Sequence, residues 1–198
     1  MGFRAFGASA ALLAVLAGCA ARPALDEFDE FLETLRGHCG KAYAGRITAN
    51  DPPQASDPFA GKSLVMHVRE CGDVVRVPFH VGEDRSRTWV LTRTPTGLRL
   101  KHDHRHSDGT PDAVTMYGGD TAKPGTAGRQ EFPVDLESRE LFAREKLTAS
   151  LTNVWAMEIS PGRFVYELAR PGRLFRAEFD LTAPVPPPPA PWGNPDGR

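Results

Sequence analysis

The sequence predicts a mainly β protein whose antiparallel strands form an up-and-down barrel or a two-layer sandwich, with a short N-terminal helix and one inserted helix. Beyond about residue 40, short segments alternate apolar and polar residues with a period of two. The chain contains 19 Gly and 18 Pro, too many helix breakers for a long helical bundle. Short connections join the last of these segments, whereas parallel strands need long crossovers, so a doubly wound sheet is excluded.

An amphipathic helix is predicted over residues 23–36. Phe28, Leu32 and Leu35 recur at steps of three and four, and acidic residues fill the opposite face. Gly37 can end the helix in the left-handed conformation. The acidic face is expected to be the solvated side.

Ten strands are predicted after this helix. They cover residues 41–48, 63–70, 73–81, 87–94, 97–106, 112–118, 128–133, 151–159, 163–170 and 173–181. In the third, Val75, Val77 and Phe79 share one face, so that face is expected to be buried. Pro-Gly turns at residues 161–162 and 171–172 join the last three strands into an antiparallel meander.

Two segments interrupt or follow the strands. Residues 135–147 are expected to form a second helix before the final meander. Residues 184–198 are rich in proline, with four consecutive prolines at 186–189, and lack the donors and apolar run that a strand needs. A β domain is therefore expected over 24–183, followed by a disordered tail.

The N-terminal segment has the layout of a secretory signal peptide. Arg4 precedes an uncharged, largely apolar run over residues 5–21 that is too short to span a bilayer comfortably. Its end, Leu16-Ala17-Gly18-Cys19, resembles the bacterial lipobox. The resemblance implies cleavage before Cys19, which would then carry the lipid; ordinary secretion is the alternative.

The lipobox resemblance implies a signal peptide at 1–18, a lipidated linker at 19–23 and a domain anchored to a membrane. Several acyl chains on one cysteine hold a protein stably, because each buried methylene contributes about 0.8 kcal/mol. Ala20 and Ala21 follow the cysteine, where an aspartate tends to retain lipoproteins in the inner membrane. The expected location is the cell envelope, at the outer membrane facing the periplasm.

Two cysteines remain in the expected mature chain, Cys39 and Cys71. In an oxidising compartment they are expected to form a disulfide. Closing a loop of roughly 30 residues gives about 3–4 kcal/mol in the chain-entropy model. The role would be structural, because a redox pair usually has the closer CxxC spacing.

The sequence combines a predicted leading helix at 23–36, a predicted antiparallel meander and a lipobox-like segment. In these features it resembles the lipocalin-like barrels of the calycin group, some of which are bacterial lipoproteins. The nearest feature to their GxW motif is Gly45-Arg46-Ile47, which lacks the tryptophan, so no ligand-binding residue is carried over. The resemblance implies an interior cavity.

Three histidines lie on one face of the strand predicted at 97–106: His102, His104 and His106. Alternate imidazoles on a strand can converge on zinc, and no other cofactor is expected. Further ligands would come from His67, His80, Asp108 or Asp112. Alternatively, the imidazoles decorate a polar barrel mouth, or contact a ligand such as an anionic head group directly.

Three further groups have both a structural and a functional interpretation, and the structural one is favoured for each. The Gly-Gly pair within Tyr117–Asp120 indicates a bulge or turn rather than a flexible loop at a pocket rim. Large side chains on predicted strands are expected to fill the core rather than line a ligand cavity: Trp89, Trp155, Met157, Phe164 and Tyr166. Three carboxylates could act as acid and base, but strand phase is expected to point them outward: Glu158, Glu167 and Glu178.

Charge and motifs narrow the function. With 24 basic and 25 acidic residues, the net charge of -1 offers no polybasic surface for nucleic acid. No GxSxG, P-loop, HExxH or GxGxxG motif occurs. We therefore expect a lipid-anchored envelope protein that binds a small hydrophobic or lipid-like ligand in a barrel without catalysis. The alternatives are a metal-binding protein or metal-dependent hydrolase using the histidines, and a structural lipoprotein; the oligomeric state is left open.

Overall fold

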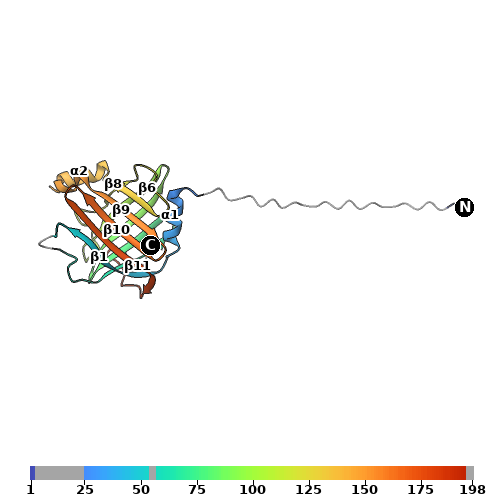
Figure 1. The fold of residues 1–198 in the computed structure, drawn as a ribbon, viewed down its shortest axis with the longest axis horizontal. Coiled ribbons are helices and arrows are strands. Elements are labelled where there is room, and N and C mark those ends of the chain that lie inside the picture. Colours follow the sequence, from blue (N-terminus) through green and yellow to red (C-terminus); the bar gives the residue numbers. More distant parts are fainter. Residues whose placement is uncertain (3–24, 54–56, 195–198) are drawn as a thin grey trace.

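One antiparallel sheet of eleven strands, curved into a nearly closed barrel, dominates the computed structural model (Figure 1). The model describes residues 1–2, 25–53 and 57–194, so the expected signal peptide, Cys19 and the linker through residue 23 lie outside the described residues. The predicted fold class is confirmed, and it is consistent with a lipocalin-like barrel. No helix in these described ranges combines the length and apolar character needed to cross a bilayer.

The elements follow one another in a simple order. They are α1 Glu27–Arg36, β1 Ala42–Asp51, β2 Leu64–His67, β3 Glu70–Cys71, β4 Val74–Val81, β5 Asp84–Thr94, β6 Gly97–His104, β7 Tyr117–Asp120, β8 Arg129–Pro133, α2 Leu136–Arg144, a 3₁₀ turn Thr148–Thr152, β9 Val154–Ser160, β10 Arg163–Arg170 and β11 Arg173–Val185. The sheet order is β7-β6-β5-β4-β2-β1-β11-β10-β9-β8, and β3 pairs with β4. Every described strand pair is antiparallel, as the short connections predict.

Strands β7 and β8 form the two edges of the sheet and meet through a close backbone approach. The Asp135 N–H donates to the Gly118 carbonyl over 3.0 Å. A Cβ on Gly118 would lie 1.9 Å from the Leu100 carbonyl oxygen, and one on Gly119 would lie 1.8 Å from that of Pro133. The interpretation of Tyr117–Asp120 as a bulge or turn is thus wrong: the segment is strand β7, and its glycines let neighbouring backbones approach.

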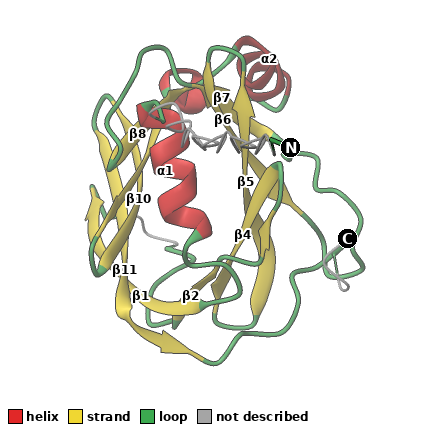
Figure 2. Ribbon diagram, turned by 90° about the vertical axis from the view of Figure 1, so that its right-hand side faces the viewer, coloured by secondary structure: helices red, strands yellow, loops and turns green. Residues whose placement is uncertain are grey.

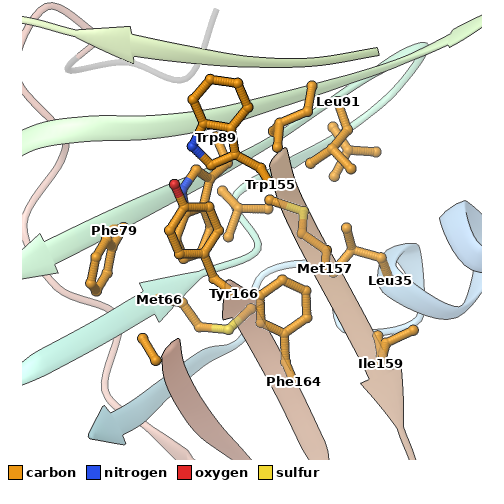
Figure 3. Close-up of a cluster of buried hydrophobic side chains, with 14 of the residues drawn as sticks. Leu35, Met66, Phe79, Trp89, Leu91, Trp155, Met157, Ile159, Phe164 and Tyr166 are labelled. Carbon is orange, nitrogen blue, oxygen red and sulfur yellow. The ribbon is translucent and has the colours of Figure 1, made fainter. Parts of the chain in front are cut away.

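Helix α1 covers one end of the barrel, where Figure 2 shows it lying across the ring of strands. The side chain of Asp26 caps it by accepting from the backbone N–H of Phe28 and of Asp29. Its apolar face is fully buried, and Leu35 belongs to the same buried cluster as Met157 and Ile159 of β9 (Figure 3). Arg93 at the end of β5 pairs with Asp26 at 2.5 Å and with Asp29 at 2.9 Å. This end of the barrel is therefore closed by apolar packing and by ion pairs at its edge.

The barrel interior is filled by residues that face inward at every second position. Near α1 the filling is dense, with Met157, Phe164 and Phe179 fully buried. Toward the other end, the Trp89 ring stacks on Tyr166 at 4.5 Å and on Phe79 at 5.0 Å (Figure 3). The packed half of the barrel thus ends in a layer of aromatic rings.

The predicted disulfide between Cys39 and Cys71 is present and joins the segment after α1 to β3. We expect the Cys39→Ser, Cys71→Ser double variant to lose about 3–4 kcal/mol of unfolding free energy, because the bond closes a loop with a separation of 32 residues. Urea denaturation followed by circular dichroism would measure this loss. A change of less than about 1 kcal/mol would contradict a stabilising role for the bond.

Over residues 184–194 the C-terminal segment differs from the disordered tail expected at 184–198, and residues 195–198 lie outside the described residues. Strand β11 continues to Val185, and the described chain beyond it is held against β3 and β5. The Trp192 N–H donates to the Arg85 carbonyl at 3.1 Å, Arg85 donates to the Ala190 carbonyl at 3.1 Å, and Asn194 donates to Glu70 at 2.6 Å. Prolines keep this segment extended without strand pairing, and carbonyls and flanking side chains supply the contacts.

Another difference concerns the strand expected at 112–118. A backbone bridge joins Arg105 to Pro111, turns follow, and the regular strand begins only at Tyr117. The Asp112 N–H donates to the His104 carbonyl, and the Asp112 side chain accepts from the Val114 N–H. Local side-chain hydrogen bonds thus hold the chain in turns where its apolar residues suggest a strand.

Candidate functional site

A pocket opens at the end of the barrel opposite α1. Its volume is about 260 Å³. The aromatic layer of the core forms much of its wall, through Phe79, Trp89, Trp155, Tyr166 and Phe175. Helix α2 and the turn that follows it contribute Phe142, Leu147 and Ser150.

The large side chains on the predicted strands therefore divide into two groups. Met157 and Phe164 fill the core, as expected. Trp89, Trp155 and Tyr166 are buried in the same core, yet they also line the pocket. Their stacking fixes the ring faces that an apolar ligand would contact.

His102 is fixed in the pocket wall by two hydrogen bonds. Its Nδ1 lies 3.1 Å from the Tyr117 carbonyl oxygen, and its Nε2 lies 2.8 Å from the Tyr166 hydroxyl. Because a carbonyl only accepts, Nδ1 donates to it and Nε2 accepts from the hydroxyl. Burial, together with the nearby His104, lowers the pKa of His102 to about 3. His102 is thus a neutral structural link with neither ring nitrogen left for a metal.

His104 lies closer to the mouth and shares the neighbouring Tyr117. Its Nε2 is 3.1 Å from the Tyr117 hydroxyl. Burial and then the positive charge of Arg87 lower the pKa of His104 to about 4. Burial raises the pKa of Tyr117 to about 12. This polar pair is therefore uncharged around neutral pH.

The structure does not bring the three histidines together. His106 is exposed beyond the end of β6, where its backbone N–H donates to the Thr110 carbonyl. Of the other suggested ligands, Asp108 accepts from Thr110, Asp112 accepts from Val114, and His67 and His80 lie on β2 and β4. Within residues 25–53 and 57–194, no group of three His, Cys, Asp or Glu side chains could hold a metal ion.

Three arginines that the sequence analysis did not single out also line the pocket: Arg87, Arg170 and Arg173. Each lies two residues from an inward-facing side chain on the same strand, so the two-residue alternation could have revealed them. Arg87 is paired with Asp84 at 2.6 Å. Burial and then the charge of Arg173 lower the pKa of Arg170.

The carboxylates of the final meander lie on the outer surface, as their strand phase predicts. Glu158 and Glu167 form ion pairs with Arg129 and Arg176, and Glu178 pairs with Arg46 at 2.9 Å. These cross-strand pairs connect β8, β9, β10 and β11. They stabilise the sheet and do not face the pocket.

Comparisons with protein-family models, with curated proteins and with solved structures find no match to this chain. The functional inference therefore depends on the chemistry of the pocket. That chemistry combines an aromatic wall, uncharged histidine–tyrosine pairs and arginines near the mouth.

Proposed function

We propose that this protein is a lipid-anchored protein of the cell envelope that binds a small or lipid-like ligand in its barrel without catalysing a reaction. The observation that carries the proposal is the aromatic pocket of about 260 Å³ at one end of a barrel that is packed solid at the other. Apolar pockets with a few placed polar groups are the usual sites for small ligands. The lipobox-like Leu16-Ala17-Gly18-Cys19 supports the anchor.

The aromatic wall favours an apolar group in the ligand. Burying apolar surface contributes about 25 cal/mol for each Å² removed from water. The rings of Trp89 and Tyr166 are already stacked, so little side-chain freedom would be lost when a ligand binds. A preformed pocket of this kind can hold a ligand by dispersion and desolvation alone.

The polar groups of the pocket favour binding over catalysis. A general acid or base works best when its pKa lies near the working pH. The pKa values of His102 and His104 are lowered to about 3 and about 4, and that of Tyr117 is raised to about 12. At neutral pH these groups keep their protons where they are and supply fixed hydrogen bonds.

The proposal predicts that narrowing the pocket abolishes binding. Leu168 lines the pocket, whereas Leu174 lies at the same end of the barrel with an exposed side chain and does not line it. In the soluble Cys19→Ser form, we expect Leu168→Trp to weaken binding of octanoate and of octanamide at least tenfold, because the indole would occupy the pocket. Titration calorimetry would measure the affinity.

Leu174→Trp is the matched control and is expected to leave both affinities unchanged. If neither compound nor any extractable small molecule binds the parent protein, the binding function is wrong. Equal affinities in the two Leu→Trp variants would place the ligand elsewhere.

A further inference from the structure

We propose that the ligand consists of an apolar group of about ten non-hydrogen atoms that carries a single acid group. Arg170 and Arg173 hold the acid group at the pocket mouth. This inference rests on the proposed binding function. The two arginines flank the turn between β10 and β11 and are directly paired across that hairpin. Both line the pocket. The hairpin thus presents two guanidinium groups beside the apolar wall of the pocket.

Arg170 and Arg173 carry positive charges that no carboxylate pairs with in the described ranges. Like charges directly opposite each other on neighbouring strands destabilise a sheet. In the described ranges neither Arg170 nor Arg173 forms an ion pair. Arg170 donates to Asn153 Oδ1 at 3.2 Å, and Arg173 donates to Asn50 Oδ1 at 2.5 Å and to the Pro52 carbonyl at 3.1 Å. Neutral acceptors orient these cations and leave their charge uncompensated.

The outer face of the same strands shows the contrast. There Arg176 on β11 contacts both Glu158 and Glu167, and Arg129 contacts the same two carboxylates and Glu131. Arg87, the third arginine of the pocket, is matched by Asp84. Arg173 is linked to the carboxylate of Asp57 indirectly, because Asn50 accepts from Arg173 and donates to Asp57. Uncompensated charge is therefore concentrated at Arg170 and Arg173.

The apolar wall and the two arginines follow one another along the inward faces of β10 and β11. Arg170 follows Leu168 on the inward face of β10, and Arg173 precedes Phe175 on the inward face of β11. The guanidinium of Arg173 lies over the Phe175 ring, 5.9 Å from its centroid. A ligand whose apolar group enters the pocket would leave its other end beside the two guanidinium groups. A planar guanidinium fits a carboxylate or phosphate through two parallel hydrogen bonds.

The volume of the pocket limits the size of the ligand. A buried cavity of about 150 Å³ holds one benzene molecule of six carbons. On that scale the pocket of about 260 Å³ takes about ten non-hydrogen atoms. A two-chain phospholipid exceeds this volume several-fold. The geometry therefore favours a medium-chain acyl acid or a small aryl acid.

The experiment compares acids with their neutral amides. Titration calorimetry on the soluble Cys19→Ser form would use octanoate, octanamide, 3-phenylpropanoate and 3-phenylpropanamide. Each acid is expected to bind at least ten times more tightly than its amide, because a hydrogen bond to a charged group is worth more than a neutral one. The Arg170→Gln, Arg173→Gln double variant should bring each acid-to-amide ratio close to one and leave the amide affinities unchanged.

Arg163→Gln is the matched control, since Arg163 lies at the opposite end of β10 and outside this pocket. It should keep the wild-type ratio. If acids and amides bind the parent protein equally, or if the double variant keeps the ratio, the acid-group inference is overturned and the binding function stands. If none of the four compounds binds, the acid-group inference is overturned, and the binding function is overturned with it when no extractable small molecule binds the parent protein either. The affinities of the acyl compounds and of the aryl compounds, compared with each other, show which apolar group the pocket binds more tightly.

Discussion

Replacing Gly119 with alanine is expected to lower the free energy of unfolding by about 4 kcal/mol or more, the largest effect of any single substitution proposed for this protein. The added Cβ would lie 1.8 Å from the Pro133 carbonyl oxygen, a separation at which atoms overlap. That oxygen belongs to backbone at the opposite edge of the sheet and cannot swing aside as a side chain would. Strands β7 and β8 must therefore separate, and the hydrogen bond from Asp135 to Gly118 would be lost with them.

Urea denaturation of Gly119→Ala and Gly72→Ala would check this expectation. Gly72 lies in the turn between β3 and β4, where an added Cβ meets no atom within 4 Å. Its replacement should change stability by less than about 0.5 kcal/mol. Equal midpoints for the two variants would show that the sheet edges do not depend on this close approach.

Acidification from pH 6.5 to pH 4.5 is the second change with a large expected effect. Burial lowers the pKa of His102 to about 3, and lowers those of His80 and His104 to about 4. In the unfolded chain these imidazoles titrate near their ordinary value of about 6.5. Below that value the unfolded state binds protons that the folded state rejects, so the free energy of unfolding falls as the pH falls.

The size of this loss follows from the same linkage. Each fully buried imidazole contributes about 1.4 kcal/mol per pH unit between its unfolded and folded pKa values. Over two units the three histidines together give roughly 5–8 kcal/mol, with the upper figure for complete burial of all three. The loss attributable to His80 and His104 levels off below pH 4, where Asp84 and Asp135, whose pKa values are also lowered, begin to lose their ion pairs.

Urea titrations at pH 6.5, 5.5 and 4.5 would measure this dependence. The buried Nε2 of His80 has no hydrogen-bond partner in the described structure, so His80→Leu should fold and should reduce the slope by about a third. The exposed His106 provides the control, and His106→Gln should keep the full slope. A stability that is flat between pH 6.5 and 4.5 would contradict the burial of neutral imidazoles.

The sequence anticipates the strands well wherever alternation is regular. The strand over 163–170 matches its prediction to the residue, and the boundaries of the strand over 73–81 agree within one residue. A half-buried strand must alternate, and Pro-Gly turns leave few other ways to connect two such strands. The helix predicted at 23–36 is present and ends at Arg36 as expected, but it begins at Glu27, because the side chain of Asp26 caps it there.

Features that depend on distant neighbours could not be predicted in the same way. The Gly-Gly pair of β7 is needed because the backbone of Leu100 and of Pro133, on other strands, leaves no room for a Cβ. His102 is neutral and structural because Tyr166, far along the chain, reaches its Nε2. The closeness of Arg170 and Arg173 follows from their hairpin, but the lack of an ion pair to either of them in the described ranges depends on every element around the pocket mouth.

The position of α1 has a consequence for how the molecule would stand on its membrane. With an anchor at Cys19, the chain from residue 20 to 26 reaches at most about 25 Å. Helix α1 covers the end of the barrel away from the pocket (Figure 2). So short a connecting segment favours an orientation in which the α1 end faces the lipid and the pocket opens toward water. In this orientation the protein would bind its ligand from the aqueous space of the envelope and not from the bilayer to which it is anchored.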